Sequence, residues 1–359
     1  MSVRIYVMTH KAFEVPKDPM YVPIHVGRAL KKAPEDSEVW NYLGDDTGDE
    51  ISKENIYYSE LTGLYWVWKN IRDVDYVGSC HYRRYLLNAQ GYPFTEQELL
   101  PLLNSYDLIT TKTLQLNFSY YYGFGENHKI QYLDTVAEVL RERYPDYYQT
   151  YEKLVHEKHT YFGNMMICSK ALYDEYMEWL FAVFFEAQKK MVIEEEDDYH
   201  RRIFGFISEF LLFVWARHKK LSVYECMVGM LGEKAETAEI KQKLADYFVR
   251  GDYEGAKQFF LESRKKRPDI LMEASDVTGE LHLCMQVIAI AGLEQQAYGT
   301  NLLEHMWDFA ELMHYCSELN RYTIARLHGE EDEELRRWLE AAGATDVAFS
   351  VSRKMFEGK

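Results

Sequence analysis

The stretch VDYVGSCHYRRY, residues 74–85, decides the fold class. It opens as a short apolar run typical of a buried strand and ends in polar and basic residues. An earlier run, RIYVM at residues 4–8, has the same character and the same kind of ending. Open α/β sheets bind ligands beyond the carboxyl ends of their strands. The residues that follow these two strands are Thr9, His10, Lys11, His81, Tyr82, Arg83 and Arg84.

Strand-like and helix-like segments alternate along the first two thirds of the chain. Further strands are expected at residues 107–111, 162–168 and 221–224, and helices at 52–72, 95–104, 129–143, 147–157, 169–187 and from 207 onward. The alternation predicts an α/β fold with a mainly parallel twisted sheet flanked by helices. Two segments are predicted to be loops, the aromatic string at 117–128 and the acidic run at 194–198.

The composition changes near Gly232, beyond which almost every segment has a helical pattern. Residues 243–269 resemble one helical hairpin of a tetratricopeptide-like unit, but no second copy follows at a fixed period. We therefore expect two domains, an α/β domain at residues 1–232 and an all-α domain of unknown role at residues 233–359.

Charge and hydropathy exclude several classes of protein. The 41 basic and 58 acidic residues give a net charge of −17, whereas sequence-independent nucleic-acid binding needs a basic surface. The longest apolar run, residues 210–216, is far shorter than the roughly 20 residues of a membrane-spanning helix. The N-terminal residues lack the apolar segment of a secretory signal. The five scattered cysteines indicate a reducing compartment. We expect a cytoplasmic protein, with peripheral association at the inner face of the membrane left open.

The string HYRRY places one imidazole and two guanidiniums, those of His81, Arg83 and Arg84, at a strand end of an acidic protein. Because arginine grips phosphate oxygens with two parallel hydrogen bonds, a pyrophosphate is the natural ligand. Structural ion pairs with nearby carboxylates are the alternative. In a parallel sheet, residues 9–11 at the end of the first strand would lie beside this basic string and would bind the base or ribose of a nucleotide. The alternative is that residues 9–11 form an ordinary polar loop.

Three carboxylates, Asp45, Asp46 and Asp49, surround a Thr–Gly turn in the string DDTGDEIS. They would bind a hard cation or a ribose, or they would cap the helix expected after Ser52. The spacing does not separate these alternatives.

Two later segments carry further candidates. Glu209, in GFISE, would act as a general base toward a sugar hydroxyl, or it would pair with Arg201 or Arg202 and hold its helix. His128, at the end of a glycine-containing segment, would contact a phosphate or sugar from a mobile flap, or would be an ordinary surface histidine. The phosphate-binding loop, dinucleotide fingerprint, nucleophile elbow, zinc-protease motif and kinase signatures are all absent from the sequence.

Together these strings resemble the bacterial glycosyltransferase-like family found among capsular and exopolysaccharide biosynthesis proteins, catalogued as a domain of unknown function. The resemblance runs in the family's order from about residue 3 to residue 225. The matching strings include IYVMTHK, YLGDDTGDEISKEN, YSELTGLYWVWKN, DYVGSCHYRRY, FGNMMICSKALYDEYMEWLF and GFISEFLLFVW, together with the region of His128.

The resemblance implies a GT-A-like fold and a transferase that uses a nucleotide-sugar, with a UDP-sugar favoured, and a glycan or lipid-linked glycan acceptor. That fold normally holds Mn²⁺ or Mg²⁺ on an Asp-x-Asp motif, but His81, Tyr82 and Arg83 stand at that position here. Metal dependence is therefore doubtful, and the basic side chains would neutralise the leaving diphosphate instead. The resemblance places Asn164 where such enzymes bind the donor or acceptor sugar, and Glu209 where a late helix supplies an acid.

The sequence thus predicts a glycosyltransferase of bacterial surface polysaccharide synthesis, with Glu209 and Asp46 as catalytic candidates. An inverting path would need one of these carboxylates as a base, but the sequence does not choose between inversion and retention. The rival prediction is a non-catalytic nucleotide- or glycan-binding protein whose helical domain docks a partner.

Overall fold

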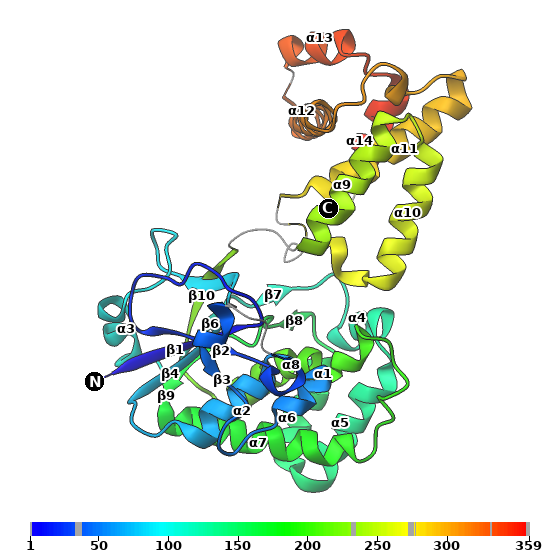
Figure 1. Ribbon diagram of the computed structural model, residues 1–359. Coiled ribbons are helices and arrows are strands. Elements are labelled where there is room, and N and C mark those ends of the chain that lie inside the picture. Colours follow the sequence, from blue (N-terminus) through cyan, green and yellow to red (C-terminus); the bar gives the residue numbers. More distant parts are fainter. Residues whose placement is uncertain are drawn as a thin grey trace. The chain divides into compact units, whose positions relative to one another are not determined.

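The computed structural model describes residues 2–32, 38–230, 235–271, 276, 278–330 and 332–356. The chain divides into two compact units, Met1–Leu231 and Gly232–Lys359 (Figure 1). The predicted domain boundary at residues 232 and 233 lies outside the described residues.

An eight-stranded sheet forms the centre of the first unit, in the order β3–β2–β1–β4–β5–β10–β6–β9 among the described residues. Its strands are β1 (Val3–Thr9), β2 (Tyr21–His25), β3 (Leu43–Gly44), β4 (Tyr76–His81), β5 (Arg84–Leu87), β6 (Leu108–Thr111), β9 (Met166–Ser169) and β10 (Val223–Met230). Two further short strands, β7 (Leu114–Gln115) and β8 (His159–Thr160), pair with each other.

The sheet is mixed, which corrects the expectation of a mainly parallel one. The pairs β1–β2, β1–β4, β2–β3 and β6–β10 are parallel, whereas β4–β5, β4–β9, β6–β9 and β5–β10 are antiparallel. The physical reason is the short connection between β4 and β5, since parallel neighbours need a crossover of a dozen or more residues. Because β4 also pairs with β9, the strands from β4 to β9 curl toward a partly closed barrel.

Alternate residues of β1 enter two different cores, as the period of a strand requires. Tyr6 and Met8 pack in the larger core with the helices α2, α5, α6, α7 and α8, whereas Ile5 and Val7 face the smaller core that includes Leu99 of α3. The helices of this unit are α1 (Asn55–Tyr58), α2 (Leu61–Asn70), α3 (Glu96–Leu103), α4 (Tyr120–Asn127), α5 (Ile130–Arg143), α6 (Pro145–Val155), α7 (Lys170–Gln188) and α8 (Ile203–Lys219).

Three local expectations are corrected. The helix predicted over 52–72 is two helices, because Ser59, at φ 53°, ends α1 before α2 begins. Its start also differs, because Ser52–Glu54 form a separate 3-10 turn, where the Ser52 hydroxyl donates to Asp45 at 2.5 Å, and α1 begins only at Asn55. The loop predicted at 117–128 contains α4, which is capped by Ser119 and buries Tyr120 in a stack on Phe210 with ring centroids 4.1 Å apart.

The second unit is helical wherever it is described. Its helices are α9 (Ala235–Val249), α10 (Tyr253–Lys266), α11 (Glu280–Tyr298), α12 (Phe309–Leu327), α13 (Glu333–Ala341) and α14 (Asp346–Phe356). They share one core that includes Leu244, Phe260, Val287 and Leu319. No helix in the described part of the chain is both long and apolar enough to cross a membrane. All five cysteines, distributed over both units, are buried free thiols.

Candidate functional site

The polar string after β4 forms a tight hairpin rather than an open loop. His81 is the last residue of β4 and pairs with Arg84, the first residue of β5. The Tyr82 N–H donates to the Met8 carbonyl at 3.1 Å, and the His10 and Tyr82 rings meet edge to face at 5.4 Å. The predicted proximity of the two strand ends is therefore confirmed.

A strained turn before β9 faces the end of β4. Gly163 and Asn164 both have positive φ, 97° and 46°, which glycine and asparagine tolerate better than other residues. The Gly163 carbonyl accepts a hydrogen bond from His81 Nε2 at 2.6 Å, and the Asn164 carbonyl accepts one from Ser79 Oγ at 2.9 Å. Two side chains of β4 thus hold this turn.

Residues from two helices complete the site. Asn164 Nδ2 donates to Glu60 Oε1 at 2.8 Å, where Glu60 directly precedes α2, and to the Gly205 carbonyl of α8 at 3.1 Å. The turn between η4 (His200–Arg202) and α8 brings in Arg202. We call the six residues around this turn the Gly163 cluster: Glu60, His81, Arg84, Asn164, Arg202 and Glu209.

The charges within the Gly163 cluster act on Glu209 of α8. Burial raises the pKa of Glu209, with a smaller contribution from the carboxylate of Glu60, whereas Arg84, a hydrogen bond from the Gly163 backbone and Arg202 lower it. The net result is a pKa of about 7. The side chain is enclosed by protein yet keeps partial solvent access. A carboxyl group with a pKa near the working pH is suited to general acid–base catalysis.

His81 is a neutral imidazole with a defined tautomer. Burial and the positive charge of Arg84 lower its pKa, and Glu60 and the Gly163 carbonyl only partly offset them. Since Nε2 lies 2.6 Å from a carbonyl oxygen, it carries the proton. Nδ1 is therefore left as a hydrogen-bond acceptor.

The two arginines of the hairpin have different surroundings. Arg84 acts electrostatically on both His81 and Glu209. Arg83 instead has its guanidinium 5.6 Å from the Tyr82 ring, with one buried Nη that has no hydrogen-bond partner among the described residues. Neither Arg84 nor Arg202 forms an ion pair with a described residue. Both guanidiniums are therefore available to pair with an anionic ligand.

Asp45 lies fully buried under the loop that joins β3 to α1. Its two carboxylate oxygens accept four hydrogen bonds: from the Gly27 and Arg28 N–H groups at 2.8 and 3.1 Å, and from the Ser52 and Thr62 hydroxyls at 2.5 and 2.6 Å. Each donor is thereby satisfied within the protein, and the carboxylate fixes β2, β3 and α2 relative to one another.

The contacts of the two other aspartates of this loop are with residues outside the Gly163 cluster. Asp46 Oδ2 lies 3.5 Å from Arg28 Nε. Asp49 is exposed and accepts a hydrogen bond from the Tyr65 hydroxyl at 3.0 Å. At the end of β1, Thr9 is buried, and its hydroxyl donates a hydrogen bond to the Lys11 carbonyl at 2.6 Å. The side chains of His10 and Lys11 are exposed.

His128 follows α4 and packs against α8. Its ring lies 4.4 Å from Phe206 and 4.9 Å from Phe124, centroid to centroid. Phe206 also carries the guanidinium of Arg202, 5.8 Å from its ring centroid. His128 therefore lies outside the Gly163 cluster, and the Phe206 ring lies between His128 and Arg202 of that cluster.

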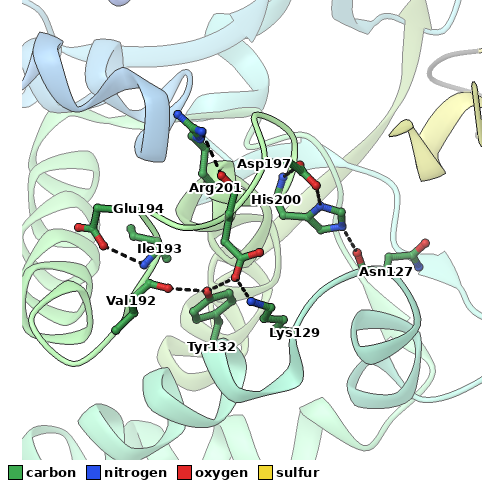
Figure 2. Close-up of polar contacts among 10 residues, drawn as sticks. Asn127, Lys129, Tyr132, Val192, Ile193, Glu194, Asp197, His200 and Arg201 are labelled. Atoms are coloured by element: carbon green, nitrogen blue, oxygen red, sulfur yellow. Dashed lines mark hydrogen bonds and ion pairs between the residues drawn. The ribbon is translucent and has the colours of Figure 1, made fainter. Parts of the chain in front are cut away.

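The acidic run leading to Arg202 is a loop, as predicted, in which every residue of 194–198 except the half-buried Glu196 is exposed, yet several of its residues make specific contacts. Glu196 contacts Lys129 and Tyr132. His200 bridges Asp197 at 2.7 Å and the Asn127 carbonyl at 3.1 Å, and Figure 2 shows this bridge. Arg201 donates to the Glu196 carbonyl at 3.0 Å. These contacts fix the segment just before Arg202 against α4 and α5.

Sequence reasoning missed Glu60 and gave Arg202 only as a partner for Glu209. The available signal for Glu60 was its place directly before a helix that follows the β3 loop, where a side chain can reach a neighbouring strand end. No group of three or more His, Cys, Asp or Glu side chains within the described ranges is arranged to hold a metal ion.

Comparison with known proteins identifies the family. The model of the domain of unknown function DUF4422 matches residues 4–220. The apo structure of WbbM, described as a bifunctional glycosyltransferase, is similar with a TM-score of 0.59 and 24% identity, over 65% of this chain and 46% of that chain. That similarity shows a shared fold over the matched region. No curated protein matches the chain. Because the family model covers more than half of its length, the chain belongs to the DUF4422 family.

Proposed function

We propose that this protein is a glycosyltransferase that moves a sugar from a nucleotide-sugar, with a UDP-sugar favoured, to a glycan acceptor. One observation carries the proposal: the basic side chains of Arg84 and Arg202 and the carboxyl group of Glu209 gather around a single turn, which His81 and Asn164 hold by hydrogen bonds. The fold shared with a bifunctional glycosyltransferase supports it. The GT-A-like character of the first unit and a role in capsule or exopolysaccharide synthesis belong to the same proposal.

The two guanidiniums would stabilise the leaving group. When the bond from the anomeric carbon to the diphosphate breaks, negative charge develops on the phosphate oxygens, and arginine meets them with charge-assisted hydrogen bonds. In a GT-A-like unit, His81, Tyr82 and Arg83 would stand where such enzymes carry metal ligands. This donor set does not fit a divalent cation, and no step of the proposal passes through one.

Glu209 would serve as the general base. Its carboxylate takes the proton of the acceptor hydroxyl while that oxygen forms a bond to the anomeric carbon and the diphosphate leaves, which is an inverting displacement. The free Nδ1 of His81 would accept a hydrogen bond from a sugar hydroxyl. Asn164, with both amide hydrogens engaged inside the protein, would shape this part of the site.

The remaining predicted residues take supporting places. The exposed His10 and Lys11 at the β1 tip would meet the base or ribose, with Thr9 holding their turn. Asp49 would reach the ribose from the β3 loop. We assign Asp45 to fixing that loop, because its oxygens are engaged by four donors. His128 would face the sugar side through Phe206, and Asp46 is kept as the second candidate base.

The test is transfer and hydrolysis with the full chain. UDP-glucose, UDP-galactose, UDP-N-acetylglucosamine and UDP-glucuronate would each be incubated with and without Mn²⁺, and UDP release would be followed. The proposal expects turnover of at least one donor that the Glu209→Gln variant loses while it still binds UDP. UDP binding without turnover of any donor or acceptor would favour a non-catalytic binding protein, docked to a partner through the helical unit, in the cytoplasm or at the membrane's inner face.

A further inference from the structure

We propose that Glu60 is the positioning residue of this site: it holds the Gly163–Asn164 turn and, through it, sets the orientation of Glu209. This inference rests on the proposed function for its kinetic consequences. Its structural consequences are measurable without any activity.

The first step of the argument is the turn itself. Asn164 adopts φ 46°, a conformation that is unfavourable for a residue with a side chain and needs support from its surroundings. Its amide nitrogen has two hydrogens, and they are donated to Glu60 Oε1 at 2.8 Å and to the Gly205 carbonyl at 3.1 Å. The Glu60 contact joins residues 104 positions apart and comes from a different element than the Gly205 contact.

The second step is what the turn holds. The peptide groups of Gly163 connect His81 with Glu209, because the Gly163 carbonyl accepts from His81 and the Gly163 backbone donates to Glu209. A rotation of the turn would therefore move both side chains together. Glu60 is the charged side chain that anchors the turn from outside the sheet.

The third step is the charge of Glu60. The groups that face Glu209 are Arg84 of β5, Glu60 before α2, Arg202 of η4 and Tyr120 of α4, with His81 sharing the Gly163 peptide. Of these, Glu60 is the one carboxylate, and its negative charge favours the protonated form of Glu209. Glu60 is close enough to α8 that a Cβ built on Gly205 would lie 3.8 Å from Glu60 Oε2.

Two substitutions separate the hydrogen bond from the charge. Glu60→Gln keeps an oxygen that accepts from Asn164 and removes the charge, whereas Glu60→Ala removes both. Glu175→Gln is the matched control, since Glu175 is a half-exposed helical carboxylate that pairs with Lys219 and is not among the groups that act on His81 or Glu209. All proteins are full length, and circular dichroism with UDP calorimetry confirms that each variant is folded and binds.

The structural readout is the pH dependence of thermal stability. In the wild-type protein, stability contributed by protonated Glu209 falls as the pH rises through about 7. In Glu60→Gln we expect this fall to occur at a lower pH, because the neighbouring negative charge is gone. An unchanged profile in Glu60→Gln, matching that of Glu175→Gln, overturns the inference whether or not the protein is a transferase.

The kinetic readout uses whichever UDP-sugar of the panel turns over. Glu60→Ala is expected to lower kcat by about 10-fold or more with the donor KM within about 3-fold, as for loss of an oriented base. Glu60→Gln should retain most of kcat and move the acidic limb of the pH–rate profile to lower pH. Wild-type kcat in Glu60→Ala would overturn the positioning role. Inactivity of the wild-type protein itself would count against the proposed function and leave the stability test to decide the role of Glu60.

Discussion

Ser59 accepts a hydrogen bond on its hydroxyl from Arg202 Nε at 2.9 Å, and its carbonyl accepts one from Asn55 Nδ2 at 2.6 Å. Asn55 Nδ2 also reaches the Thr62 hydroxyl at 3.0 Å, and that hydroxyl lies 2.6 Å from Asp45 Oδ2. Ser59 thus connects two regions that the sequence presents as separate, the buried carboxylate of the β3 loop and the guanidinium of the Gly163 cluster. The positive φ of Ser59, 53°, turns the backbone between α1 and α2 so that Ser59 can make both contacts.

Asp45→Ala should destabilise the first unit severely. The substitution leaves four buried or half-buried donors without their acceptor, and each such loss costs about 1–3 kcal/mol. We expect the free energy of unfolding, measured by urea denaturation with tryptophan fluorescence, to fall by at least about 3 kcal/mol. Asp49→Ala, an exposed change in the same loop, should cost under about 1 kcal/mol. Equal losses in the two variants would show that Asp45 does not hold the loop.

Arg84→Ala should weaken UDP binding far more than Arg83→Ala. Arg84 faces His81 and Glu209, whereas Arg83 lies against Tyr82. Loss of charge-assisted hydrogen bonds to the diphosphate predicts a rise in the Kd for UDP of about 10-fold or more. Isothermal titration calorimetry on both variants, with circular dichroism to confirm folding, makes the comparison. The opposite order of the two Kd values would reassign the diphosphate to the Arg83 side of the hairpin.

Glu209→Gln should remove a pH dependence of stability. The folded pKa of about 7 exceeds that of an unfolded glutamate, so the folded state binds more protons than the unfolded state between about pH 4.3 and 7. The wild-type protein therefore loses stability from this group as the pH rises through that range. The variant should gain about 3 kcal/mol over the wild type at pH 8 and nothing at pH 4. A constant difference at every pH would contradict the raised pKa.

UDP binding should be accompanied by proton uptake. An anionic diphosphate beside Arg84 and Arg202 neutralises the charges that lower the pKa of Glu209, so that pKa rises on binding. At pH 7.5, above the second phosphate pKa of about 6, the ligand itself is ionised. A rise of one unit would take up about half a proton. Calorimetry in buffers of different ionisation enthalpy measures the uptake, which Glu209→Gln should abolish.

Local features of the fold were predictable because they depend on neighbours in the sequence. The apolar runs at residues 4–8 and 74–80 correspond to β1 and β4, and the helix predicted over 95–104 is α3, which begins at the capping box of Thr95 and Glu98. The helix predicted from residue 169 is α7, and the Ser169 hydroxyl caps it by accepting from the Leu172 N–H. Strand β5 was missed because it is only four residues long and begins with an arginine directly after β4.

The candidate site was less predictable because it depends on distant contacts. Glu60 meets Asn164 across 104 positions, and no spacing rule encodes that meeting. Helix α4 contains two glycines and three consecutive tyrosines, a composition with low helix propensity, and packing of Tyr120 on Phe210 outweighs it. The strings around His81 and Glu209 drew attention through their residue types, but only the fold shows that one glycine peptide links them.

The buried thiols have a practical consequence for work on this protein. Burial raises the pKa of each cysteine, so the reactive thiolate form is scarce at neutral pH, and none of the five side chains is exposed. A single cysteine introduced at an exposed position such as Tyr92, which is 69% accessible on the first unit, would be the preferred target of a maleimide reagent. Fluorescent or spin labels can therefore be attached at one chosen place in the native background, without first stripping out the natural cysteines.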